Sequence, residues 1–195
     1  MTISVVGSGS PVVVTYRPEW PERAATVIST LAQRLSGLVD RLEHIGSTSI
    51  PGMAAKDVLD LQASVPTLGV ADERFDDLLG ALRLQPSPYR QDHVPAWRRD
   101  DPEEWAKRLW TRRGHPDGDV NLHVRRSRSP NERLALLFRD WFRAHPDAIP
   151  AYTAFKIALA DAIPDREPYT QVEDPVVDLV IVLAERWATS VDRHP

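Results

Sequence analysis

Hydrophobic residues recur at helical spacing in several stretches of the chain. Between residues 21 and 36, apolar side chains stand three or four positions apart, and Pro21 and Glu22 suit the first turn of a helix. The same spacing predicts helices over 69–84, 130–145, 149–162 and 172–190. The last three would make the C-terminal third of the chain helical.

Alternation of apolar and polar residues predicts the strands. It occurs over 39–45, 57–65, 104–113 and 119–126, and the turn-forming sequence Gly-His-Pro-Asp-Gly joins the last two. Prolines at 86, 88, 95 and 102 argue against regular structure over 85–103, so we expect a long loop there with at most a short strand. The order of the elements predicts an α+β fold, with a mixed, mostly antiparallel sheet backed by helices.

Two of the predicted strands each carry one polar face. In 57–65, alternation places Asp60, Gln62 and Ser64 on the same side of the strand. In 119–126, it places Asn121 and His123 opposite three apolar residues. If the two strands are neighbours in the sheet, these side chains converge near the turn that precedes the first of them.

That turn has the sequence His-Ile-Gly-Ser-Thr-Ser-Ile-Pro-Gly, over 44–52. A Gly/Ser turn followed by a strand with a carboxylate can hold a phosphate beside a metal ion. Backbone N–H groups and hydroxyls donate to phosphate oxygens, and the carboxylate supplies the hard oxygen that Mg²⁺ prefers. An ordinary turn or helix N-cap has the same composition, so that alternative stays open. Lys56 could neutralise a phosphate here or be an ordinary solvated lysine.

The longer segment over 44–65, HIGSTSIPGMAAKDVLDLQASV, resembles the signature of the GrpB-like family within the nucleotidyltransferase superfamily. Later stretches agree in order and spacing: VNLHV at 120–124, LFRD at 137–140, the pair His145-Pro146, Tyr152 and Lys156. The resemblance extends from about residue 16 to about residue 187. It implies a Pol β-type nucleotidyltransferase fold, but the family has no agreed reaction.

Enzymes of this superfamily pair a Gly-Ser turn with an Asp-x-Asp strand and a third carboxylate, and so bind two Mg²⁺ ions. Two metals stabilise the attacking and leaving oxygens of a phosphoryl displacement. In this chain Asp60 fits the first position, Gln62 stands at the second, and Asn121 and His123 stand on the later strand. The resemblance therefore implies a single Mg²⁺ held through Asp60. The alternative is that Asp60 caps a strand end or pairs with an arginine.

Three further side chains are candidates for contact with a ligand. His123 could donate to a phosphate, ligate a metal as neutral imidazole, or act as a general base, and a hydrogen-bonded strand histidine is the alternative. Arg108 and Arg112 share a face of their strand with Trp110 between them, which suits a phosphate and a stacked base, or simply an exposed strand of mixed charge. The candidate catalytic residues are Asp60 and His123; the candidates for binding substrate or phosphate are Gly46, Ser47, Thr48, Ser49, Lys56, Gln62, Asn121, Arg108 and Arg112.

Composition sets the class of protein and of partner. The chain has 195 residues, 42% hydrophobic and 27% charged, so we expect one globular domain over 16–190 after a flexible segment, 1–15. A net charge of −4 gives no broad positive field for nucleic acid, so we expect a small nucleotide or phosphorylated ligand instead. The absence of cysteine excludes disulfides and thiolate chemistry. The sequence has neither a signal-peptide pattern nor an apolar run of membrane length, so we expect a cytoplasmic protein.

Two functions stay open. The first is an enzyme that binds a nucleoside triphosphate and Mg²⁺ at the Gly46–Ser49 turn and Asp60, and transfers a nucleotidyl group to an acceptor that the sequence does not identify. The second is a binding or accessory domain that keeps the site without the chemistry, which Gln62 and the missing third carboxylate favour. GrpB-like domains occur fused to dephospho-CoA kinase, which implies a coenzyme A-linked role, although this chain has no P-loop GxxxxGK[ST] of its own. Its oligomeric state does not follow from the sequence.

Overall fold

The computed structural model of the chain describes residues 12–163 and 166–195. Its elements occur in a mixed order along the chain. They are α1 (Trp20–Arg34), β1 (Arg41–Ile45), β2 (Val58–Val65), α2 (Leu68–Gly80), β3 (Gln85–Pro86), β4 (Lys107–Arg112), β5 (Asp119–Arg126), α3 (Pro130–Ala144), α4 (Ile149–Ala162) and α5 (Arg166–Ser190).

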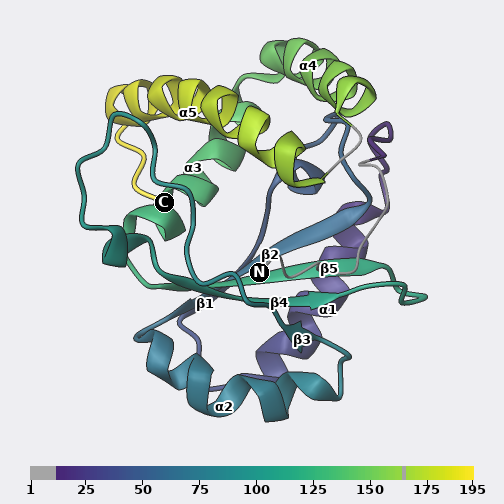
Figure 1. Ribbon diagram of the computed structural model, residues 1–195, viewed down its shortest axis with the longest axis vertical. Coiled ribbons are helices and arrows are strands. Elements are labelled where there is room, and N and C mark those ends of the chain that lie inside the picture. The colour runs from purple at the N-terminus through teal and green to yellow at the C-terminus, as the bar shows by residue number, and fades with distance from the viewer. Residues whose placement is uncertain (1–11, 164–165) are drawn as a thin grey trace, which may run out of the picture.

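The strands form one mixed sheet in the order β1-β2-β5-β4-β3, within the described residues. Strands β2 and β5 are parallel, and the other neighbouring pairs are antiparallel. Helix α2 lies on one side of the sheet, and α4 and α5 lie on the other (Figure 1). The predicted mixed, mostly antiparallel sheet backed by helices is therefore confirmed, including a short strand in the proline-rich loop.

The apolar face of the sheet packs against α1 and α2. Alternate residues of the two central strands point to this side, and they meet apolar residues of both helices. The core here includes Leu59, Leu61, Val120 and Leu122 of the sheet with Trp20, Leu31, Phe75 and Leu79 of the helices. Each of these side chains is fully buried, so this face is the main hydrophobic core.

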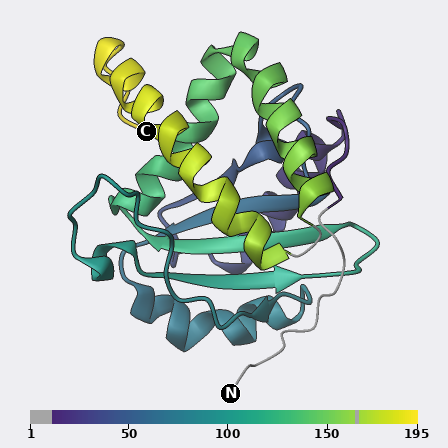
Figure 2. The same ribbon diagram turned by 45° about the horizontal axis from the view of Figure 1, so that its top comes forward.

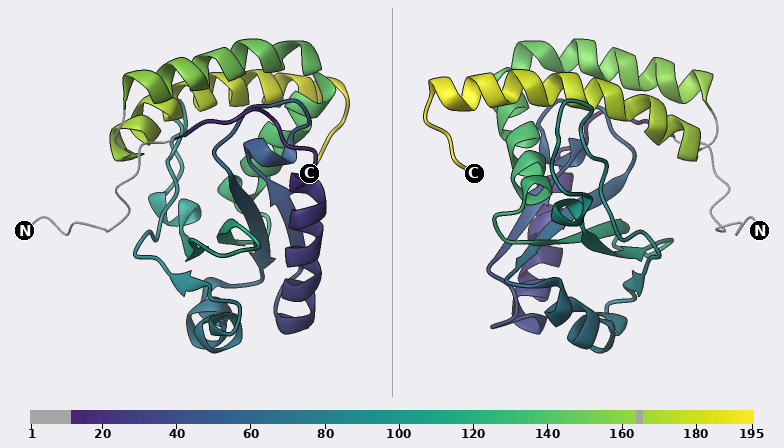
Figure 3. Two further views of the ribbon diagram at one scale, coloured as in Figure 1. Left: turned by 90° about the vertical axis from the view of Figure 1, so that its right-hand side faces the viewer. Right: turned by 60° about the vertical axis from the view of Figure 1, so that its left-hand side comes forward.

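Helices α3, α4 and α5 form a second layer over the opposite face (Figures 2 and 3). They pack on one another through a core of their own, which contains Leu137, Phe142, Tyr152 and Ile181. Ile50 and Met53, which follow the turn after β1, join the same core. The turn between β1 and β2 is thereby fixed between the sheet and the helical layer.

A buried polar cluster separates this helical layer from part of the sheet. Glu132 of α3 accepts hydrogen bonds from Ser64 Oγ at 2.6 Å and Arg41 Nη2 at 2.5 Å. Nearby, Arg125 Nε and Lys107 Nζ donate to Asp92 at 2.7 and 2.5 Å. Because every charge in this cluster has a partner, the polar face of β2 can be buried at the α3 end without an isolated charge.

Some predicted boundaries differ from the structure. The strand predicted over 104–113 begins only at Lys107, because residues 102–105 form a 3-10 turn. The helix predicted over 69–84 ends at Gly80, shortly before Arg83, whose φ is 55°. Of the segment predicted to be flexible, residues 1–11 lie outside the described residues, and Val14 forms a β-bridge with Ala55. None of the helices described is both long and apolar enough to span a bilayer.

Candidate functional site

The turn after β1 lies directly against the carboxylate of Asp60. Gly46 has a φ of 66°, and a Cβ added to it would lie 2.7 Å from Asp60 Oδ2. Ile45, the last residue of β1, pairs with Asp60 in the sheet, which places the start of the turn above that side chain. Glycine is required here for two separate reasons, the backbone angle and the close approach.

Asn121 and His123 reach the same carboxylate from β5. The parallel register of β2 and β5 sets Asp60 beside Asn121 and Gln62 beside His123. Asn121 Nδ2 donates to Asp60 Oδ1 at 2.7 Å, and His123 Nε2 lies 3.5 Å from the same oxygen. The side chain of Asp60 is 32% exposed and that of His123 is 17% exposed, so the group is partly accessible to solvent.

The ionisation of this group follows from its contacts. Burial tends to raise the pKa of Asp60, but the interactions with His123 and Asn121 outweigh it, so the pKa lies below its usual value. Burial lowers the pKa of His123. His123 Nδ1 lies 3.5 Å from Arg125 Nη2, which can only donate, so the ring proton belongs on Nε2 and points to Asp60. In this arrangement the hydrogen bond from Asn121 holds the Asp60 carboxylate, and the His123 ring stands beside it.

Gln62 does not join this open group. It is completely buried, its amide oxygen accepts from Arg125 Nη1 at 2.6 Å, and its amide nitrogen donates to the Glu132 carbonyl at 3.2 Å. Alternation correctly assigned Gln62 to the polar face of β2, but α3 covers that half of the face. Its hydrogen bonds account for a neutral amide at this position.

The hydroxyls of the turn divide into internal ones and one that faces the site. Ser49 Oγ donates to the Gly46 carbonyl at 2.6 Å, and Thr48 Oγ1 lies 2.9 Å from His44 Nε2. Both residues are buried, and together they close a 3-10 turn, not a regular helix, so the structure does not present these predicted phosphate-binding hydroxyls to a ligand. Ser47 is partly exposed and accepts from Lys156 Nζ at 2.6 Å.

Lys156 of α4 is a part of the site to which the sequence assigned no role. It is 3% exposed, and burial lowers its pKa to about 8, with Glu173 of α5 acting in the opposite direction and Lys56 in the same one. Lys56 Nζ lies 3.9 Å from the centre of the Tyr169 ring. One sequence feature could have pointed to Lys156: it is the single lysine of the apolar helix IPAYTAFKIALADA. A lysine in such a helix is either buried with a partner or breaks up its apolar surface.

Arg108 and Arg112 lie on the other face of the sheet, so the structure does not bring these two predicted residues to the site. They stand beside Val124 and Val120, which belong to the core under α1 and α2. Arg108 forms a two-point ion pair with Asp72 of α2, at 2.5 and 2.6 Å. Both faces of β4 mix charged and apolar residues, so alternation alone could not show which of them α2 covers.

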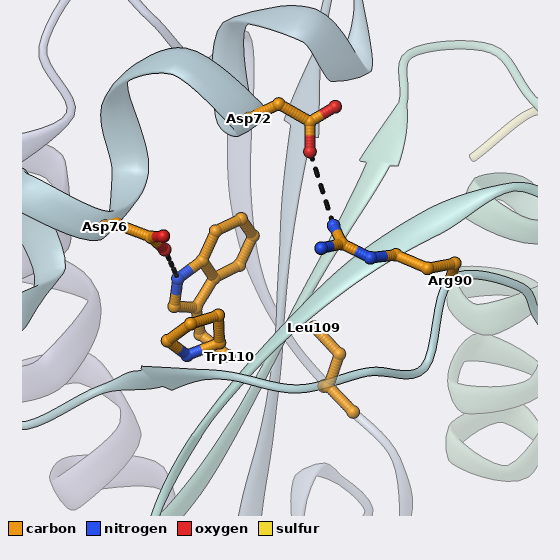
Figure 4. Close-up of a pocket in the computed structure, with 6 residues that line it drawn as sticks. Asp72, Asp76, Arg90, Leu109 and Trp110 are labelled. Carbon is orange, nitrogen blue, oxygen red and sulfur yellow. Dashed lines mark hydrogen bonds and ion pairs between the residues drawn. The ribbon is translucent and has the colours of Figure 1, made fainter.

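Trp110, between these arginines, is not available for base stacking. It is 3% exposed and packs against Phe75 with the ring centres 5.5 Å apart. Its indole Nε1 donates to Asp76 at 2.8 Å, beside the ion pair of Asp72 with Arg90 (Figure 4). Trp110 is thus packed against α2 and cannot stack on a base.

Asp57, which stands just before β2, has separate partners. Its carboxylate accepts from Arg17 at 2.6 Å and from Trp20 Nε1 at 2.8 Å. These contacts fasten the entry of α1 to the start of β2, and they leave Asp60 as the carboxylate of β2 that faces the site.

The donor chemistry of the site limits the metal it could hold. The described residues contain no group of three or more His, Cys, Asp and Glu side chains placed to bind a metal ion. Asp60 Oδ1 already accepts from Asn121, and Gln62 is occupied by Arg125. These donors do not fit a two-metal set. One Mg²⁺ held by Asp60 and completed by waters and a ligand's phosphate oxygens, which is how proteins commonly bind this ion, stays a prediction.

Comparison with known proteins places these features in a family. Residues 10–182 match the family described as GrpB protein. A protein named "Dephospho-CoA kinase" from Mycolicibacterium paratuberculosis is 34% identical over 91% of this chain and 47% of its own length, and the one from Mycobacterium tuberculosis is 33% identical over the same shares. The chain thus spans about half the length of these curated relatives.

Two other proteins match more of their own length. The "UPF0157 protein PA4798" of Pseudomonas aeruginosa is 33% identical over 91% of this chain and 67% of its own length. The crystal structure of conserved protein GrpB from Enterococcus faecalis superimposes with a TM-score of 0.67, covering 90% of this chain and 99% of that one at 23% identity. This structural likeness supports the fold and says nothing of the ligand.

Proposed function

This chain belongs to the GrpB family, and we propose that it binds the phosphate end of a nucleotide-type small molecule at the turn between β1 and β2. The observation that carries the proposal is the hydrogen bond from Lys156 Nζ to Ser47 Oγ, beside a turn that rests on Asp60. A buried ammonium, a hydroxyl and a tight glycine turn are suitable donors for phosphate oxygens. The ligand-binding residues would be Gly46, Ser47, Lys56, Asp60 and Lys156.

The charges of the site favour a ligand that brings a cation with its phosphate. Lys56 and Lys156 face the carboxylates of Asp60 and Glu173, and each of these four groups interacts electrostatically with others of the set. A bare phosphate would be attracted by the lysines but repelled by Asp60. One Mg²⁺ at Asp60 would relieve that repulsion and polarise the phosphate. The lysines would then neutralise the remaining phosphate charge.

The names of the relatives suggest a first ligand. The mycobacterial proteins are named for dephospho-CoA, which contains a nucleotide with phosphate groups. Because this chain matches only about half of each, its own ligand is a proposal. We propose dephospho-CoA as the first candidate and ATP as the second.

Nucleotidyl transfer is the second candidate function. It is favoured by the contact of Gly46 with Asp60, which is the arrangement expected of a Gly-Ser turn and metal-binding carboxylate in a Pol β-type fold. It lacks a second carboxylate, because Gln62 is buried in hydrogen bonds with Arg125 and Glu132. We therefore favour ligand binding without nucleotidyl transfer.

Thermal unfolding with a ligand panel tests the proposal. A ligand present at 100 times its Kd should raise the free energy of unfolding by roughly 2.7 kcal/mol. We expect dephospho-CoA or ATP with Mg²⁺ to give such a shift, and Asp60→Asn to remove the Mg²⁺-dependent part while the protein without ligand stays folded. If neither ligand raises the unfolding temperature with or without Mg²⁺, the proposal is wrong.

Release of pyrophosphate during incubation with Mg²⁺, nucleoside triphosphates and a mixture of small-molecule acceptors separates the two candidate functions, because pyrophosphate leaves only when an acceptor or water takes the nucleotidyl group. Nucleotide binding without release of pyrophosphate supports the accessory domain. Binding with pyrophosphate that is lost in Asp60→Asn supports the transferase.

A further inference from the structure

A cavity lies on the opposite side of the sheet from Asp60. It is bounded by α1, by the segment that follows α2 and by the turn between β4 and β5, and its volume is about 420 Å³. Small-molecule sites commonly measure about 300–1,000 Å³. The cavity is thus large enough for a small ligand, and the site proposed above makes no use of it.

Arg112 supplies a buried positive charge to this cavity. The residue is 7% exposed, and its Nε donates to the Gly118 carbonyl at 3.2 Å. Its Nη2 is buried and has no hydrogen-bond partner among the described residues. A buried donor without an acceptor is costly, so an incoming acceptor would gain more here than at the protein surface.

Arg23 of α1 brings a second guanidinium to the same end of the cavity. A Cβ added to Gly118 would lie 1.7 Å from Arg23 Nη2, so this side chain rests on the glycine whose carbonyl Arg112 contacts. Burial lowers the pKa of Arg112. The charges of Asp117 and Asp119 oppose that shift, and the charge of Arg23 adds to it. The Nη1 of Arg23 is bound to Asp57 at 3.0 Å, so this cation is partly neutralised and held in place.

The side chains along the walls of the cavity are apolar or already hydrogen-bonded. Val27, Leu82 and Leu84 supply apolar surface. The hydroxyls of Thr26 and Thr30 each donate to a carbonyl one turn earlier in α1, at 3.1 Å. The cavity is therefore apolar or already hydrogen-bonded along its sides. It is cationic at one end, where the exposed carboxylate of Asp117 also lines it and offsets part of the charge of the two arginines.

We propose that this cavity binds a small amphipathic anion: a carboxylate or phosphate head placed at Arg112 and Arg23, with a short alkyl chain along Val27, Leu82 and Leu84. The head would accept a hydrogen bond from Arg112 Nη2, the donor of this guanidinium that has no partner. The chain would pack over Leu82, which is partly exposed, with the buried Val27 and Leu84 beside it. This site is separate from the turn at Gly46, and the proposal does not depend on ligand binding at that turn.

Methyl NMR of the wild-type protein with simple probes tests the site. Octanoate and octyl phosphate supply the two kinds of head, octanol supplies the chain without charge, and acetate supplies a head without the chain. We expect octanoate or octyl phosphate to shift the methyl signals of Val27, Leu82 and Leu84, and to leave those of Ile50 and Leu134 unchanged. The stronger of these two probes identifies the head group.

Titration of variants then tests the cationic end. Arg112→Met should raise the Kd of the stronger probe by about tenfold or more, as expected for loss of a charged hydrogen bond. Arg34→Met removes the same charge from the exposed end of α1 and should leave the Kd unchanged. If Arg112→Met does not fold, Arg23→Met is tested in its place.

Three results would overturn the proposal. The first is an absence of shifts in the Val27, Leu82 and Leu84 methyl signals with both anionic probes. The second is binding of octanol as tight as that of the anions, which would make the cavity merely apolar. The third is an unchanged Kd in the arginine variant.

Discussion

Gly46 and Asp60 are in direct contact, so that the α-carbon of the glycine rests on the carboxylate. A Cβ at Gly46 would lie 2.7 Å from Asp60 Oδ2 and 3.0 Å from Asp60 Cβ. This contact joins the turn between β1 and β2 to the carboxylate of β2. The proposed ligand site depends on it, because any displacement of the turn would also displace Ser47 and its hydrogen bond with Lys156.

Gly46→Ala should destabilise the protein by more than the backbone angle alone requires. A non-glycine residue held at positive φ costs about 1–3 kcal/mol, and the clash with Asp60 adds to that cost. Gly52→Ala is the matched control, since Gly52 has a φ of 83° and open space around its α-carbon. Urea unfolding of both variants measures the difference, and equal losses would show that the contact with Asp60 does not constrain the turn.

Arg125→Met should be strongly destabilising. Arg125 donates to Asp92 and to Gln62, and the side chain of Arg125 is 7% exposed. Removal of one partner of a buried ion pair typically costs about 3–5 kcal/mol, because the remaining charge stays buried. Arg126→Met, at the exposed neighbouring position, should change the free energy of unfolding little. A small effect of Arg125→Met in urea unfolding would mean that Lys107 alone compensates Asp92.

Stability should fall as the pH falls below that at which an ordinary histidine titrates. Burial lowers the pKa of His44 from 6.5 to about 4, so the unfolded chain binds this proton more readily than the folded one. The contribution of neutral His44 is fully present above pH 6.5 and is lost as the pH falls toward 4. Urea unfolding across this range should show a smaller pH dependence in His44→Gln than in the wild type.

The exposed His194 provides the control for that experiment. His194→Gln should leave the pH dependence as it is in the wild type, because the ring of His194 is 77% exposed. If His44→Gln and His194→Gln give the same profile, the buried imidazole is not the source of the pH dependence.

Affinity for a phosphate ligand should weaken as the pH rises through about 8. Burial lowers the pKa of Lys156 to about 8, and only its protonated form attracts phosphate. In Lys156→Arg the side chain stays charged to much higher pH. The affinity of this variant for the ligand should therefore vary less between neutral pH and pH 9 than that of the wild type. Equal pH dependence in the two proteins, measured by calorimetric titration, would show that Lys156 does not contact the ligand.

Much of the open site could be predicted from the strands. The faces of Asp60, Asn121 and His123 follow from alternation, and the parallel pairing of β2 with β5 brings them together. Gln62 has the same parity, but whether it is open depends on α3, which lies 70 residues away along the chain and supplies the Glu132 carbonyl. A strand pattern carries no information about such a cover.

The remaining differences also arise from contacts between distant segments. Arg108 and Arg112 face α1 and α2 because their neighbours Val124 and Val120 do, which requires knowledge of the register. The contact of Lys156 with Ser47 spans 109 residues, and no local spacing predicts it. Thr48 and Ser49 were correctly placed in a turn, but their hydroxyls are used within it.

Calorimetric titration of dephospho-CoA with Mg²⁺ into the wild type, Lys156→Met and the control Arg34→Met tests the proposed phosphate site most directly. We predict that the wild type and Arg34→Met bind with the same Kd and that the Kd of Lys156→Met is about tenfold higher or more, a loss of at least about 1.4 kcal/mol. If the folded Lys156→Met variant binds as tightly as the wild type, the ligand's phosphate does not lie at the turn formed by Gly46 and Ser47.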